Sequence, residues 1–107
     1  MKKVPPAVPH DVETIRELKD PKEAERYLNA CVQVAFDEDD PELILLALYN
    51  VAQAQGVKKT ADAARMHRVS LHRMLTKGGN PEWRSLFRLL AAMHLPFRFE
   101  LPKVLAA

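Results

Sequence analysis

The sequence has one cysteine, three glycines and no long apolar run, and each of these scarcities excludes a class of protein. A lone Cys31 cannot form a disulfide within the chain, so a reducing cytoplasm is the expected compartment. The longest strongly apolar run, 43–48, is far shorter than the roughly 20 residues that a membrane span needs. Lys2 and Lys3 precede no apolar stretch, which argues against a signal peptide. We therefore expect a cytoplasmic protein with no membrane contact.

The chain also lacks the residue constellations of an enzyme or a metal site. It has no nucleophile with a base partner, no glycine-rich phosphate loop and no paired carboxylates on a buried face. The acidic run 37–40 lacks the alternating oxygen spacing and the glycine of a calcium loop, so we interpret it as a solvated loop. The histidines show no metal-ligand spacing; they are His10, His67, His72 and His94. We expect no catalysis, no cofactor and no metal.

The composition indicates one globular domain over 1–107, and its charge is uneven. Of the 107 residues, 48% are hydrophobic and 28% are charged, which is typical of a folded soluble chain. In 1–40, six Lys and Arg oppose ten Asp and Glu, whereas in 41–107 ten Lys and Arg oppose four Asp and Glu. This asymmetry is typical of one surface for phosphate and another for a different partner, although ordinary surface scatter explains it equally well.

A cap residue followed by proline predicts the start of a helix at three places. Asp or Asn accepts from the free N–H groups of the first turn, and proline is favoured at the first helical position. The pairs are Asp20-Pro21, Asp40-Pro41 and Asn80-Pro81. They predict helices over 21–36, 41–55 and 81–94. Glu23 has the spacing of a capping-box partner, and Gly56 is typical of a helix end.

The apolar residues of these helices predict the core. The helix 41–55 is apolar on most sides and is expected to be the buried central helix. The helix 21–36 carries an apolar stripe, and Cys31 on it is expected to be a small core residue; the stripe is Ala24, Leu28, Cys31, Val32, Ala35 and Phe36. The helix 81–94 is expected to bury one face, made by Trp83, Leu86, Phe87, Leu90 and Met93.

The two ends carry weaker signals. An N-terminal arm and a short helix from about Asp11 to Lys19 occupy 1–20. Residues 97–101 alternate apolar and polar side chains between two prolines, which predicts a short strand. Because a lone strand needs a partner, this one is expected to pair with the N-terminal arm or with a second copy of the chain.

Residues 57–77 have the pattern of a helix-turn-helix. A short helix over about 59–65, a turn at Met66-His67 and a second helix over 68–77 are predicted, with Gly78-Gly79 as the stop. Ala61 and Ala64 are small enough to let the two helices cross closely. The second helix is anchored to the core by Leu71, Met74 and Leu75. Such a unit places the N-terminal half of its second helix in the major groove of DNA.

The side chains left outside on this second helix are the candidate DNA contacts. Base contacts are predicted for Arg68, Val69, His72 and Arg73, because arginine pairs with guanine and valine contacts the thymine methyl; a solvated side chain is an equal alternative for His72. Phosphate contacts are predicted for Lys58, Lys59, Lys77, Asn80 and Arg84. In 56–88, eight Lys and Arg oppose only two acidic residues, so local charge and motif agree.

The turn departs from the usual pattern at two positions. The position that needs a positive backbone φ, where glycine is usual, is Arg65, at a cost of roughly 1 kcal/mol. His67 stands where a Ser or Thr cap is usual. These departures weaken the match at the turn and leave the packing positions untouched.

Several segments together resemble the addiction-module antidote family, HigA-like antitoxins with a lambda-repressor-like, Xre-type domain. The resemblance covers about 18–95 and rests on Tyr27-Leu28-Asn29-Ala30, Asp40 to Leu48, Val51-Ala52, Gly56, the helix-turn-helix and Gly79-Asn80-Pro81. We expect an all-α fold of five or six helices, with its helical core over 21–94 and a short C-terminal β-strand. The resemblance implies a homodimer that represses its own operator and neutralises a RelE/HigB-like toxin.

Two other functions stay open. In the first, the acidic half (21–36 and 37–40) binds a basic toxin, and DNA binding is weak or lost. In the second, the chain is a stand-alone Xre-type regulator without a toxin. The departures from the usual turn pattern at Arg65 and His67 are the reason for keeping the first of these alternatives.

Overall fold

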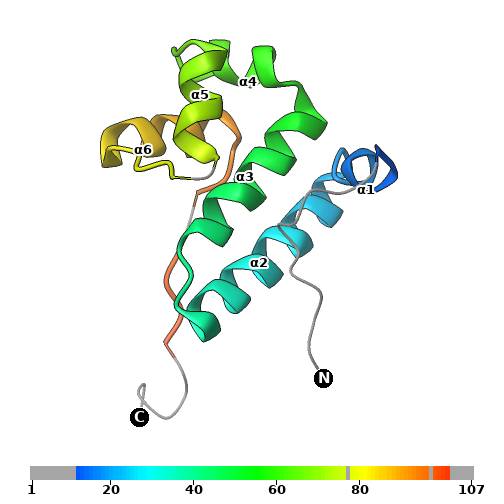
Figure 1. Ribbon diagram of the computed structural model, residues 1–107. Coiled ribbons are helices and arrows are strands. Elements are labelled where there is room, and N and C mark those ends of the chain that lie inside the picture. Colours follow the sequence, from blue (N-terminus) through cyan, green and yellow to red (C-terminus); the bar gives the residue numbers. More distant parts are fainter. Residues whose placement is uncertain (1–11, 77, 97, 102–107) are drawn as a thin grey trace.

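The computed structural model describes residues 12–76, 78–96 and 98–101, and all the regular secondary structure in them is helical (Figure 1). The helices are α1 (Val12–Glu17), α2 (Pro21–Glu38), α3 (Glu42–Gln55), α4 (Val57–Ala63), α5 (Arg68–Leu75) and α6 (Trp83–Ala92). The long helices α2 and α3 form an antiparallel hairpin. Helices α4, α5 and α6 gather at one end of it, and the α2–α3 connection lies at the other end. The prediction of an all-α chain with five or six helices is confirmed.

Helix α2 begins where the sequence predicts and ends two residues later. The Asp20 carboxylate accepts from the backbone N–H of Lys22 at 3.0 Å, as expected of an N-cap. Glu23 does not complete a capping box: the Asp20 N–H donates to the Glu17 carbonyl at 3.2 Å, and the Glu23 carboxylate accepts from the Arg26 guanidinium at 2.8 Å. The helix stops at Asp39, whose φ of 54° is left-handed.

The two other predicted caps are wrong. Pro41 itself is the N-cap of α3, and Asp40 contributes its backbone carbonyl, which accepts from the Leu43 N–H at 3.2 Å. Helix α6 begins at Trp83 rather than at 81, with Glu82 in extended conformation before it. Residues 78–82 are not helical and lie in the connection between α5 and α6.

Helix α3 is the central helix, as predicted, because other helices cover it on several sides. It buries seven residues, among them Ala47, Val51 and Ala52, which have no exposed surface. Leu71 and Leu75 from α5 are completely buried in the same core. Cys31 on α2 is also completely buried, which confirms it as a core residue.

Four large apolar side chains that were predicted to be buried are exposed. On α2, Val32 is 37% and Phe36 76% exposed, and on α6, Trp83 is 58% and Phe87 55% exposed. Each helix contacts the core along a narrower face than its apolar stripe. For α6 that face centres on Leu89, which is completely buried and was absent from the predicted stripe.

The predicted C-terminal strand is absent from the residues that the structure describes. Residues 98–101 have no regular secondary structure, and Phe97 lies outside the described part. Phe99 is 90% and Leu101 68% exposed, so the alternating pattern does not place these side chains against a core. The N-terminal arm 1–11, including His10, also lies outside the described part. Among described residues, no helix is both long and apolar enough to cross a membrane.

Candidate nucleic-acid interface

Helices α4 and α5, joined by a short turn, are packed as tightly as the sequence predicts. We call residues 57–75 the α4–α5 unit. Ala61 and Ala64 are each 1% exposed, so no larger side chain fits where the two helices meet. The backbone N–H of Met66 donates to the Ala61 carbonyl at 3.0 Å and closes the turn. Helix α4 begins and ends two residues earlier than predicted, and α5 begins at Arg68 as predicted.

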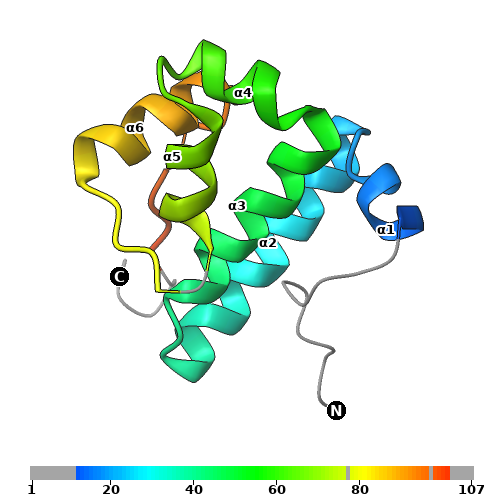
Figure 2. The same cartoon turned by 45° about the horizontal axis from the view of Figure 1, so that its top comes forward.

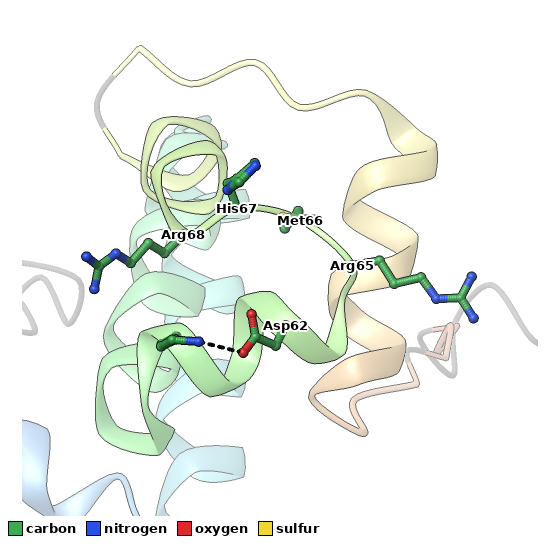
Figure 3. A pocket seen from close by; sticks show the side chains of 6 residues that line it. Asp62, Arg65, Met66, His67 and Arg68 are labelled. Carbon is green, nitrogen blue, oxygen red and sulfur yellow. Dashed lines mark hydrogen bonds and ion pairs between the residues drawn. The ribbon is translucent and has the colours of Figure 1, made fainter.

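The turn contains the strained residue that the sequence indicates. Arg65 has a φ of 61°, in the left-handed region, which confirms the expected positive φ at this position. Its N–H donates to the Asp62 carbonyl at 3.0 Å. Figure 3 shows the Arg65 side chain pointing away from Arg68, so the two guanidinium groups leave the turn in different directions.

Helix α5 begins without a side-chain cap. His67 occupies the N-cap position in extended conformation, and no hydrogen bond from its side chain caps the helix. Its carbonyl accepts the first helical bond, from Leu71 N–H at 3.0 Å. The N–H groups of the first turn of a helix have no acceptor inside the helix, so this end can accommodate an acceptor oxygen from outside.

The four residues predicted to contact bases are all exposed on α5, and one of them differs from the rest. Arg68, Val69 and Arg73 project to solvent, with Val69 59% exposed. His72 is exposed but lies with its Nδ1 2.9 Å from the Tyr49 hydroxyl on α3, and the two rings meet edge to face with centroids 5.2 Å apart. His72 therefore links α5 to the central helix.

Two shallow hollows border α5. One, of about 540 Å³, lies at the turn and is lined by Lys58, Asp62, Arg65, Met66, His67 and Arg68 (Figure 3). On its α4 side, Lys58 and Asp62, one helical turn apart, form an exposed ion pair at 3.0 Å. The other, of about 470 Å³, runs between α5 and α6 and has Arg73 and Arg88 in its lining. Both hollows are open to solvent, and open, cationic surfaces are typical of contacts with nucleic acid.

Four of the five residues predicted to contact phosphate are described by the structure, and all four are exposed. Lys58, Lys59 and Arg84 are exposed, and Lys77 lies outside the described residues. Asn80 is exposed but does not stand at a helix start, because α6 begins at Trp83. A phosphate contact by Asn80 stays a prediction that now rests on its position alone.

Two residues that the sequence reasoning missed support the arrangement. Tyr49 holds His72, and Arg88 on α6 donates from Nε to the Ala64 carbonyl at 3.3 Å, just before the strained turn. Each pair joins residues 23 or 24 positions apart. No local spacing signals such a contact, so only the folded chain brings these residues together.

The buried titratable groups lie away from this interface, between α2 and α3. Burial raises the pKa of Tyr27 to about 12, although its hydrogen bond from the Asn50 amide, 2.7 Å long, acts in the opposite direction. Burial also raises the pKa of the Cys31 thiol, to about 11. A thiol that stays protonated in a closed core is a poor nucleophile. Among the described residues, no group of three or more His, Cys, Asp or Glu side chains forms a metal site.

Comparison with known proteins gives two matches. The family model described as "Probable addiction module antidote protein" matches residues 10–101. A protein of Haemophilus influenzae, described as uncharacterized, is 31% identical over 90 residues, which is 84% of this chain and 89% of the relative. No solved structure matches the chain.

Proposed function

The chain belongs to the family of probable addiction module antidote proteins, and we propose that it is an antitoxin that also represses its own operon by binding operator DNA through α4 and α5. Family membership suggests a regulatory role rather than catalysis and implies a toxin as partner. The proposal adds that this toxin is RelE/HigB-like and that the DNA-binding form is a homodimer. In this proposal, the α4–α5 unit is the DNA-binding helix-turn-helix.

The observation that carries the DNA proposal is the exposed face of α5. Arg68, Val69 and Arg73 project from a helix whose other side is completely buried through Leu71 and Leu75. Side chains on such a fixed helix hold their geometry, and arginine and valine are suited to read guanine and thymine edges in the major groove. The base-contact set remains Arg68, Val69, His72 and Arg73, with His72 positioned by Tyr49.

Phosphate groups fit the surroundings of that face. Lys58, Lys59 and Arg84 are exposed beside it, and the uncapped start of α5 offers N–H groups to an oxygen. Asn80 and Lys77 complete the proposed set. Such contacts contribute affinity for any DNA sequence and make binding sensitive to salt.

A DNA titration of the purified chain tests the proposal. Arg68→Ala or Arg73→Ala is expected to weaken binding to the chain's own promoter duplex by about 1–3 kcal/mol, roughly 5- to 150-fold, as measured by fluorescence anisotropy. The matched control is Arg26→Ala, which removes an exposed arginine of α2 that pairs with Glu23. If both α5 variants bind the promoter like wild type, α5 is not the reading helix.

The second candidate is a toxin-binding module with weak or no DNA binding. Residues 27–57 contain five acidic residues and no Lys or Arg, so the α2–α3 connection fits a basic partner. Co-purification with the product of a neighbouring, roughly 100-residue basic reading frame tests this. Toxin capture without promoter binding supports this second candidate, and promoter binding with no such reading frame supports a stand-alone Xre-type regulator.

A further inference from the structure

Helix α5 packs against the central helix α3, and a polar contact joins them beside the proposed DNA-reading face (Figure 2). The Nδ1 atom of His72 lies 2.9 Å from the Tyr49 hydroxyl oxygen, and the two rings meet edge to face at an interplanar angle of 79°. Tyr49 is half-buried on α3, whereas His72 is exposed on α5. The contact therefore turns one nitrogen of an exposed imidazole toward the protein.

The chemistry of the two groups indicates which one donates. A neutral imidazole carries hydrogen on only one nitrogen, and the hydrogen bond at the other nitrogen decides which one it is. Among the described residues, the Tyr49 hydroxyl bonds to His72 Nδ1 alone. A phenol oxygen shares its lone pairs with the ring, so the hydroxyl donates better than it accepts. The hydroxyl therefore donates to Nδ1, and the hydrogen of the neutral ring lies on Nε2.

The Nε2 atom of His72 is a donor in both charge states of the ring. The protonated ring carries hydrogen on both nitrogens, so Nδ1 then donates to the hydroxyl oxygen and Nε2 keeps its own hydrogen. In the part of the chain that the structure describes, Nε2 has no hydrogen-bond partner. The exposed side chain therefore offers a donor N–H at the nitrogen that does not bond to Tyr49.

This donor lies beside a second one. Arg68 is exposed one turn before His72, and residues four apart share a face of a helix. The arginine side chain has donors and no acceptor. In the major groove, the acceptors for such donors are N7 and O6 of guanine, N7 of adenine and O4 of thymine. A ring with its hydrogen on Nδ1 would instead accept from the amino groups of adenine or cytosine.

We infer that Tyr49 is a positioning residue for DNA reading, because its hydroxyl fixes His72 as a hydrogen-bond donor that selects base edges with an acceptor. The inference rests on the proposed function, in which α5 lies in the major groove. Tyr49 acts through His72 and not by a contact of its own with a base. A phosphate oxygen is an acceptor as well, so the experiments below distinguish a base edge from a phosphate.

Nitrogen-15 NMR of the free chain tests the tautomer without DNA. At about pH 8, where histidine side chains are ordinarily neutral, His72 is expected to show hydrogen on Nε2 and an unprotonated Nδ1. His67 is exposed and does not cap α5 with its side chain, so it is the internal control and is expected to show the averaged shifts of exchanging tautomers. Tyr49→Phe is expected to give His72 the same averaged shifts. Hydrogen on Nδ1, or averaged shifts in the unaltered chain, overturns the inference.

Promoter binding, measured by fluorescence anisotropy, tests the role in reading. His72→Ala is expected to weaken binding about 2- to 12-fold, because one hydrogen bond is lost, and Tyr49→Phe by a smaller factor. The double variant is expected to bind like His72→Ala, and additive losses would overturn the inference. Tyr27→Phe is the matched control, since it removes a hydroxyl bonded to Asn50 on the far side of α3, and no change is expected. Circular dichroism checks that each variant is folded.

Single base-pair substitutions in the promoter duplex locate the acceptor. Tyr49→Phe and His72→Ala are expected to lose discrimination at the same base pair and to keep it elsewhere. Equal weakening on every duplex would indicate a phosphate acceptor and overturn the selection of base edges. If the unaltered chain does not bind the promoter, the proposed function fails together with this reading role. If Arg68→Ala weakens binding and Tyr49→Phe does not, the proposed function stands and this inference alone fails.

Discussion

The two ends of the molecule are built differently. At the α4–α5 end, Ala61, Ala64, Leu71 and Leu75 are each exposed by 1% or less, and the exposed charged side chains are five Lys or Arg and one Asp. At the far end of the α2–α3 hairpin the core is thin, with Ala35 at 3% and Leu43 at 9%, and Phe36 stands 76% exposed among carboxylates. The comparison teaches that this chain places its best packing beneath the surface proposed to read DNA, where side-chain positions matter most.

The largest effect expected from this comparison concerns two buried leucines. Leu71→Ala is expected to lower the free energy of unfolding by about 3–5 kcal/mol, because it opens a cavity in a closed core. Leu43→Ala is expected to cost about 2 kcal/mol, since the smaller cluster at the far end can relax around it. Urea titration followed by circular dichroism measures both, with Phe36→Ala as an exposed control. Equal losses of unfolding free energy in Leu71→Ala and Leu43→Ala would contradict the proposed difference in packing between the two ends of the molecule.

Alkaline pH is expected to act on the hairpin. The folded pKa of Cys31 is about 11 against an ordinary value of 9.0. Because the folded value is the higher one, the stabilising contribution is complete below pH 9 and is lost as the pH rises to 11. The loss is about 2–3 kcal/mol.

Tyr27 adds a similar loss from pH 10 upward, because its folded pKa is raised to about 12. Urea midpoints at pH 8, 10 and 11 measure the sum of the two losses. In Cys31→Ala, the urea midpoint is expected to fall less between pH 9 and 10 than in the wild type. An unchanged pH dependence of the midpoint in this variant would show that the Cys31 thiol does not cause the loss of stability.

A smaller effect is expected at two of the three described non-glycine residues with left-handed backbone. Arg65 and Asp39 have φ values of 61° and 54°. Aspartate tolerates this region better than arginine because its short polar side chain bonds locally. Arg65→Gly is therefore expected to raise the free energy of unfolding by about 0.5–1 kcal/mol, and Asp39→Gly by less. Thermal unfolding of both variants checks the order, and a destabilised Arg65→Gly chain would mean that the arginine side chain contributes more than its strain costs.

The smallest expected effect is on the salt dependence of DNA binding. Lys58→Ala is expected to reduce the slope of log K against log salt by about one, because one phosphate contact is lost. Its ion pair with Asp62 is exposed and contributes little to stability, so the fold is expected to be unaffected. Glu25→Ala, an exposed residue of α2 outside the α4–α5 unit, is the control. An unaltered slope in Lys58→Ala would remove this residue from the proposed phosphate set.

Local signals predicted much of the fold and part of the site. Asp20, Gly56 and the alanines of α4 act through their immediate neighbours, so their positions predicted the start of α2, the end of α3 and the close approach of α4 to α5. The left-handed Arg65 followed from the spacing of the same unit. Asp40 and Asn80 were wrongly predicted as N-caps. The residue that caps α3 or α6 depends on the path of the connection before that helix, which the neighbouring residues alone do not determine.

The sequence by itself determined the six helices, the buried central helix and the exposure of Arg68, Val69 and Arg73, because periodicity and propensity are properties of neighbouring residues. Only the tertiary structure decided that Tyr49 holds His72, that Trp83 and Phe87 face solvent, and that 98–101 form no strand. Each of these depends on what another part of the chain leaves open or covers. An apolar stripe indicates that one face of a helix can be buried. The packing of the other helices determines which part of that face is buried.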